Sequence, residues 1–127
     1  MTDRQEVERL VRELHAARIE GRLDALCALF ASDATFRIAG ASDGKPIKIS
    51  ARNATEIRSW LSMMVRTFRL TRYELLSLVV EGNQAAAHWR VAIHSKITGV
   101  VVPTELVDLV EVRLGSIAAY TELFVPC

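Results

Sequence analysis

The residues best suited to chemistry lie near the end of the chain. Asp108 falls within a run rich in valine and leucine, and Tyr120 and Glu122 lie in the apolar run that follows. Carboxyl groups and a phenol can donate or accept protons, so these residue types suit proton transfer, dehydration or activation of water. Burial raises the pKa of a carboxyl group, and two such groups close together titrate apart, leaving one as acid and one as base. This chemistry requires the fold to bring the three side chains together.

The histidines and cysteines give weaker signals. His15 flanks the apolar stripe of an expected helix, where a partly exposed histidine is ordinary. His88 and His94 are six residues apart and share one strand face, but the sequence offers no further ligand beside them, so we expect no metal site. Cys27 sits in an apolar helical pattern and is expected to be a buried hydrophobic residue, while Cys127 ends the sequence. Neither a disulfide framework nor a metal-binding spacing is present.

The bulk properties predict one domain with an ample core. The chain has 127 residues, of which 50% are hydrophobic, and a formal net charge of +1. This near-neutral charge gives no reason to expect nucleic acid or an anionic membrane as a partner. The charged N-terminal segment does not resemble a signal peptide, and no apolar run approaches a membrane span, so we expect a cytoplasmic protein.

Hydrophobic periodicity divides the chain into helices followed by strands. Residues Asp3 to Glu20 repeat apolar side chains at helical spacing, with Gly21 suited to the helix end. Further helices are expected at 22–31 and from Asn53 to Phe68, a short strand at 34–38, a loop or wide hairpin at 39–46, and a short strand at 45–50. Four strands are expected at 73–81, 85–97, 100–113 and 117–125. Hairpin-connected strands after helices predict an antiparallel sheet with helices on one face, an α+β fold.

Three segments carry a family resemblance over nearly the whole chain. They are GRLDALCALFASDATFRIAG, VVEGNQAAAHWRVAI and VDLVEVRLGSIAAYTELF, and they resemble the nuclear transport factor 2-like superfamily, also called SnoaL-like or ketosteroid-isomerase-like. The resemblance implies a single domain over residues 1–127. It would be a cone-shaped, strongly curved antiparallel sheet with three helices from the N-terminal half enclosing one pocket. Members include isomerases, polyketide cyclases, dehydratases, epoxide hydrolases and non-enzymatic binding or assembly domains, so the fold alone decides no chemistry.

The same resemblance implies which strand faces point into the cone. It places Asp108, Tyr120 and Glu122 on neighbouring inward positions, as tentative catalytic residues. His15 is expected at the pocket mouth. The other expected ligand-binding residues are Leu14, Arg18, Trp60, Met64, Trp89, Val91, Ile93 and Phe124.

The sequence departs from the isomerase pattern. Ketosteroid isomerases use a tyrosine on the first helix and an aspartate at the end of the first strand, and those positions hold Leu14 and Ile38 here. Only the late-strand acid has a counterpart, Asp108, so we expect no steroid isomerisation by that mechanism. The paired pocket histidines of scytalone dehydratase are not matched either, since the two strand histidines are expected to point outward. Epoxide hydrolases use an Asp-Arg-Asp pattern. Similar residue types are present here, as Asp108, Arg18, Glu122 and Tyr120, but they do not match the sequence motif of those enzymes.

Two hypotheses for function follow. One is an acid–base enzyme without cofactor or metal, of isomerase, cyclase, dehydratase or hydrolase type, acting on a small apolar substrate, either cyclic or open-chain. The other is a non-catalytic domain that binds a small apolar ligand or serves in assembly. Arg18 separates them, because a cation that caps the acids as a buried ion pair favours the second. The apolar outward residues Val107 and Leu109 predict a homodimer through the convex face of the sheet.

Overall fold

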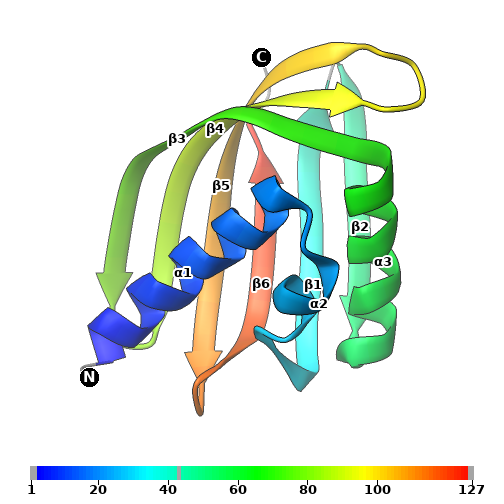
Figure 1. Cartoon of the computed structure of the whole chain (residues 1–127). Coiled ribbons are helices and arrows are strands. Elements are labelled where there is room, and N and C mark those ends of the chain that lie inside the picture. The colour runs from blue at the N-terminus through cyan, green and yellow to red at the C-terminus, as the bar shows by residue number, and fades with distance from the viewer. Residues whose placement is uncertain (1–2, 43, 126–127) are drawn as a thin grey trace.

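A computed structural model describes residues 3–42 and 44–125 of the chain. Within these residues there are three helices and six strands, arranged as an α+β fold (Figure 1). The helices are α1 (Asp3–Glu20), α2 (Leu23–Cys27) and α3 (Asn53–Thr67). The strands are β1 (Phe30–Ser42), β2 (Lys45–Arg52), β3 (Phe68–Glu81), β4 (Gln84–Ser95), β5 (Val101–Arg113) and β6 (Ser116–Phe124).

The strands form one sheet in the order β2-β1-β6-β5-β4-β3. Figure 1 shows the sheet bending sharply, with α1 lying across β3 to β6 and α3 beside β1 and β2, so that the helices close the hollow side of a cone. Four neighbouring pairs are antiparallel, but β1 and β6 run parallel. The predicted antiparallel sheet is therefore confirmed for four of the five strand pairs, and the β1–β6 pair departs from it. The antiparallel prediction rested on hairpins, which join consecutive strands, whereas β1 and β6 are far apart in the sequence.

The contact between β1 and β6 explains a glycine. Gly40 has φ 110°, a conformation that side chains with a Cβ rarely adopt, and it lies opposite Phe124 in the parallel register. A Cβ at this position would overlap the backbone of Phe124. The close approach of the two strands therefore requires glycine here.

Helix α1 has the bounds that the periodicity predicts, and the other early elements differ. Helix α2 ends at Cys27, four residues before the predicted end, because Phe30 already pairs with Ile117 in the sheet. The predicted loop at 39–46 is largely strand, since β1 continues to Ser42 and β2 begins at Lys45. Pairing with β6 holds β1 extended well beyond the short alternating run that the sequence displays.

Helix α3 begins with a reciprocal cap. The Asn53 side chain accepts a hydrogen bond from the Glu56 N–H at 3.1 Å, and the Glu56 carboxylate accepts one from the Arg52 N–H at 2.9 Å. The cap fixes where α3 leaves β2, so its apolar face, which includes the buried Ile57 and Leu61, packs on the sheet. None of the helices in the described residues is long and apolar enough to cross a membrane.

Candidate functional site

The register of the last two strands brings the predicted acids together. Asp108 on β5 lies directly opposite Glu122 on β6, and Tyr120 lies one pair further along on the same face. All three side chains point to the hollow side, as predicted, and none is more than 2% exposed. The alternating burial of β5, in which Leu106 and Val110 are also buried, confirms the inward assignment of this strand.

Asp108 is tied to helix α1 through His15. The ring Nε2 of His15 lies 2.8 Å from Asp108 Oδ2, and its Nδ1 lies 2.7 Å from the hydroxyl oxygen of Tyr73 on β3. His15 is 1% exposed, so the expectation of a partly exposed histidine at the pocket mouth is wrong. Its ring instead packs against Trp89, with centroids 4.4 Å apart. The helical pattern placed His15 beside the apolar stripe, but it could not show that Asp108 on β5 lies opposite His15.

Glu122 is capped by a cation. Arg18 Nη1 donates a hydrogen bond to Glu122 Oε2 and forms an ion pair with it, and the Tyr120 hydroxyl donates to the same oxygen at 2.7 Å. The guanidinium also lies 5.5 Å from the centroid of the Trp89 ring, within range of a cation–π contact. Arg18 is four residues after Leu14 on the inner stripe of α1, so one turn of helix carries it into the cone. The neutralising contact anticipated from the sequence is present.

Burial sets the protonation of the cluster. Burial raises the pKa of Asp108 to about 6, and the positive charge of Arg18 opposes this rise. Burial raises the pKa of Glu122 to about 7; the charge of Arg18 opposes this rise, and the charge of Asp108 adds to it. Burial and the positive charge of Arg18 lower the pKa of His15 to about 4, so the imidazole is neutral near pH 7. Burial opposes the charge of Arg18, but Glu122, Tyr120 and Asp108 outweigh it and raise its pKa.

Two carboxylate oxygens of the cluster lack partners. Asp108 Oδ1 and Glu122 Oε1 are buried and receive no hydrogen bond from any described residue, and the buried Trp89 indole N–H donates none to them. An unpartnered carboxylate oxygen is costly to bury, and a proton on one acid lowers that cost. A single proton on the acid pair would balance the charge of Arg18, since His15 is neutral.

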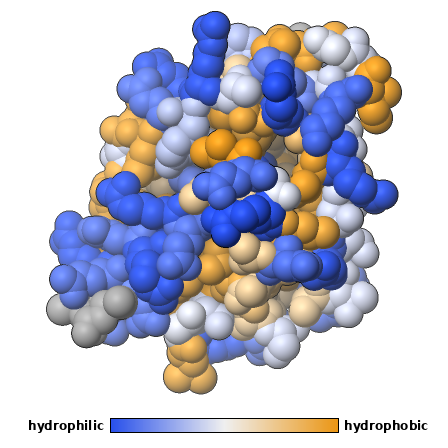
Figure 2. All heavy atoms as spheres, in the orientation of Figure 1, coloured by the Kyte–Doolittle hydropathy of each residue, from blue (hydrophilic) through white to orange (hydrophobic). Residues whose placement is uncertain are grey.

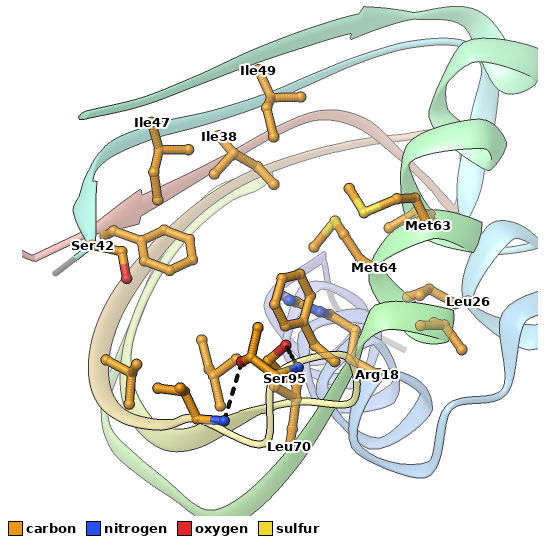
Figure 3. Close-up of a pocket in the computed structure, with 18 residues that line it drawn as sticks. Arg18, Leu26, Ile38, Ser42, Ile47, Ile49, Met63, Met64, Leu70 and Ser95 are labelled. Carbon is orange, nitrogen blue, oxygen red and sulfur yellow. Dashed lines mark hydrogen bonds between the residues drawn. The ribbon is translucent and has the colours of Figure 1, made fainter. Parts of the chain in front are cut away.

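The pocket lies on the other side of Arg18 from the acids. It has a volume of about 500 Å³, within the roughly 300–1,000 Å³ of small-molecule sites. Fourteen of its eighteen lining residues are apolar, and α3 contributes Met63 and Met64 while β1 and β2 contribute Ile38, Ile47 and Ile49 (Figure 3). Among the described residues that line it, Arg18 is the one that carries a charge. The pocket is therefore an apolar cavity with one cationic spot.

The structure divides the predicted ligand-binding residues into two groups. Arg18, Met64, Ile93 and Phe124 line the pocket. The others pack beneath or beside it and are absent from its wall: Leu14, His15, Trp60, Trp89 and Val91. Trp89 is fully buried, and Trp60 is half-buried against the core. The strand parity was right for β4, but Trp89 faces Arg18 and His15 and not the cavity.

The sequence reasoning missed much of the wall. The turn between β4 and β5 folds over the pocket and supplies Ser95, Thr98 and Val100, and Phe68 comes from the start of β3. Ser95 ends β4, and Thr98 and Val100 lie in the turn after it, where strand alternation defines no inward face. The apolar alternation at Ile47 and Ile49 was the one available signal for β2.

The outer face of the sheet carries the remaining histidines. His94 Nε2 lies 2.7 Å from the Thr71 hydroxyl, and His88 Nε2 lies 3.5 Å from Glu105. No cluster of His, Cys, Asp and Glu side chains within residues 3–42 and 44–125 is arranged to hold a metal ion. A second hollow, of about 870 Å³, is lined by His94 together with Arg90 and Glu74.

A profile of the SnoaL-like domain matches residues 11–120. The chain belongs to the SnoaL-like family. Its fold is that of the nuclear transport factor 2-like superfamily, which also contains the ketosteroid-isomerase-like proteins. No protein of curated function matches this SnoaL-like sequence.

Solved structures share the fold at low sequence identity. A Bacillus subtilis protein provisionally named an isomerase has a TM-score of 0.84 and 17% identity, over 98% of this chain and 89% of that one. A Mycobacterium tuberculosis epoxide hydrolase of the LEH-like type has a TM-score of 0.77 and 17% identity, over 94% and 83%. A Catenulispora acidiphila protein with a ketosteroid isomerase-like fold, in complex with trimethylamine, has a TM-score of 0.74 and 17% identity, over 89% and 82%. At these identities the likeness extends to the fold alone, and the site must be argued from its own residues.

Proposed function

We propose that this SnoaL-like protein binds a small, largely apolar molecule that presents a hydrogen-bond acceptor to Arg18. The observation that carries this proposal is the makeup of the pocket, an apolar wall around one guanidinium. Burial of apolar ligand surface supplies the affinity, and one fixed polar group supplies orientation. Met63 and Met64 add adaptable surface, because the unbranched thioether side chain fills irregular gaps.

Arg18 is held ready for such a ligand. Glu122 pairs with the guanidinium and Trp89 packs against it, and the hydrogen bond to Glu122 occupies one of its five N–H donors. The remaining donors are free to face a carbonyl, carboxylate or hydroxyl oxygen of the ligand. A hydrogen bond to a charged group contributes about 1.5–3 kcal/mol, so Arg18 would favour acceptor-bearing ligands by about tenfold or more.

The position of the acids supports binding more strongly than catalysis. Asp108 and Glu122 are fully buried, are absent from the pocket wall, and lie behind the Arg18 guanidinium. A general acid or base must lie within hydrogen-bond reach of the atom it serves. With Arg18 paired to Glu122, neither carboxyl group reaches the cavity.

Acid–base catalysis is the second candidate, and the pKa values favour it. Asp108 and Glu122 titrate near neutrality, where a proton donor or acceptor works best, and Glu122 Oε1 is unpartnered. A ligand oxygen that drew Arg18 away from Glu122 would place a base beside an oxyanion-stabilising cation, suited to isomerisation, dehydration or hydration. For any substrate found, Glu122→Gln would abolish turnover while leaving binding intact, whereas unchanged turnover would eliminate this candidate.

Two fluorescent probes of nearly the same shape test the binding proposal. Anilinonaphthalene sulfonate carries an anionic group, and N-phenyl-1-naphthylamine lacks it. Met64→Trp, which fills the pocket, should weaken both probes at least tenfold, while Val79→Trp on an exposed site of β3 should not. Arg18→Gln combined with Glu122→Gln should weaken the anionic probe selectively. Unchanged affinity of the neutral probe in Met64→Trp would refute the proposed pocket.

The homodimer expected from the sequence remains part of this proposal. Leu109 is 43% exposed on the outer face of β5, and Val107 beside it is half-buried. An apolar strip on an exposed sheet face suits a two-fold interface that leaves both pockets open on the opposite side. A cytoplasmic location is likewise proposed on the sequence arguments alone.

A further inference from the structure

Basic side chains gather around the mouth of the pocket. Each of them lies next to a wall residue in the chain or across the β1–β2 hairpin from one: Lys45, Lys48, Arg66, Arg69 and Lys96. This group, here called the basic rim, includes all three lysines of the sequence. Four of its members lie beside the wall residues of α3, β2, β3 and β4, and Lys45 pairs with Ser42. The β1–β2 hairpin, the end of α3, the start of β3 and the β4–β5 turn, which carry Lys45, Arg66, Arg69 and Lys96, come together at the upper right of Figure 1.

The near-neutral net charge conceals this asymmetry. The described residues 44–49, 63–70 and 93–102 contain the five basic residues of the rim and no acid. The other described residues carry eleven basic side chains against fourteen acidic ones, and Asp43 lies outside the described residues. A global balance of +1 thus divides into a positive end around the pocket mouth and a negative remainder.

Exposed apolar side chains occupy the same end. Ile97 is 80% exposed at the turn between β4 and β5, Val100 is 56% exposed, and Phe68 is 36% exposed at the pocket edge. Lys96 anchors the turn, because its Nζ donates to Val65 O at 3.1 Å and its backbone N–H donates to Thr67 O at 2.8 Å. Figure 2 shows hydrophilic and hydrophobic residues side by side at the upper right, where Figure 1 places this turn.

We infer that the basic rim and the Ile97 turn dock the protein on an anionic lipid surface, with the pocket mouth facing the bilayer. Lysine and arginine near the surface are attracted to anionic headgroups, and aliphatic side chains enter the boundary between headgroups and acyl chains. Lysine stems can lie along apolar surroundings while their ammonium groups stay at headgroup level. An acidic protein partner would satisfy the rim but would give the isolated Ile97 tip no comparable surroundings. An apolar ligand could then enter the pocket from the membrane without crossing water.

Vesicle flotation at low salt tests this inference. The wild-type protein should float with vesicles of phosphatidylcholine and phosphatidylglycerol at a 3:1 ratio, and not with phosphatidylcholine alone. Lys45→Gln with Lys48→Gln and Arg69→Gln should reduce the floated fraction at least fivefold, and Ile97→Ser at least threefold. Neither change alters a pocket-wall residue.

Matched control variants lie at exposed positions away from the rim. Arg4→Gln with Arg52→Gln and Arg113→Gln removes the same charge, and Leu114→Ser removes a 97% exposed leucine from the β5–β6 turn. Both controls should float like the wild type. Failure of the wild type to float, or an equal loss in the controls, overturns the inference. The filled-pocket variant Met64→Trp should still float, which separates this inference from the proposed ligand binding.

Discussion

Removing the Arg18 guanidinium should destabilise the protein in a strongly pH-dependent way. The perturbation is Arg18→Met, which keeps most of the side-chain volume and leaves Glu122 buried without its cation. Breaking a buried ion pair by removing one partner costs about 3–5 kcal/mol. That is a large share of the roughly 5–15 kcal/mol that stabilise an ordinary domain.

The pH dependence follows from the sign of the Glu122 shift. Its pKa is raised from 4.5 to about 7 in the folded protein, so this group contributes stability below pH 4.5 that is lost as the pH rises towards 7. Without Arg18 the folded pKa rises further, because the largest opposing influence is gone. The variant therefore continues to lose stability above pH 7, by about 1 kcal/mol per pH unit, while the wild type levels off. The difference between them should be smallest near pH 5, where Glu122 is protonated in both.

Urea unfolding at pH 5 and pH 8, followed by the fluorescence of the buried Trp89, measures this difference. Adding Glu122→Gln to Arg18→Met should restore most of the stability at pH 8, because no buried charge is then left unpaired. The control is Arg9→Met, which breaks an ion pair with Glu13 in which both side chains are more than 40% exposed, and should cost at most about 1 kcal/mol. An equal cost of Arg18→Met at both pH values would refute the reasoning, as would a cost no larger than that of the control.

Two further predictions concern the histidine and the outer face. The lowered pKa of His15 gives stability that is present above pH 6.5 and lost as the pH falls towards 4, opposite in sign to the contributions of Asp108 and Glu122. As the pH rises from 4.5 to 6.5, the free energy of unfolding should therefore fall more steeply in His15→Asn than in the wild type, by about 1 kcal/mol per pH unit. Urea titration measures this slope, and an unchanged slope would contradict a neutral buried imidazole. On the outer face, Leu109→Glu should convert a dimer into the 14.1 kDa monomer in light scattering, while Val79→Glu should not, and a wild type that is already monomeric at micromolar concentration would end the dimer proposal.

Local pattern was sufficient where a side chain's surroundings lie nearby in the chain. The apolar stripe of α1 predicted its bounds, and strand alternation placed Asp108, Tyr120 and Glu122 on one face of the sheet. Local pattern failed where a strand pairs with another strand that is distant in the sequence. Pairing with β6 extended β1 to Ser42, and β1 and β6 are parallel, which no hairpin pattern can indicate.

The sequence by itself determined the residue types of the site, which are two acids, a tyrosine and an arginine on the inner stripe of α1. Only the tertiary structure decided how they are used. Strand register put Asp108 opposite Glu122, and the packing of α1 across the sheet gave His15 to one acid and Arg18 to the other. It also set the pocket on the far side of Arg18, away from both acids. The reason is physical, since the pKa values, pairing and access of these groups depend on desolvation and on charges supplied by segments about 100 residues apart.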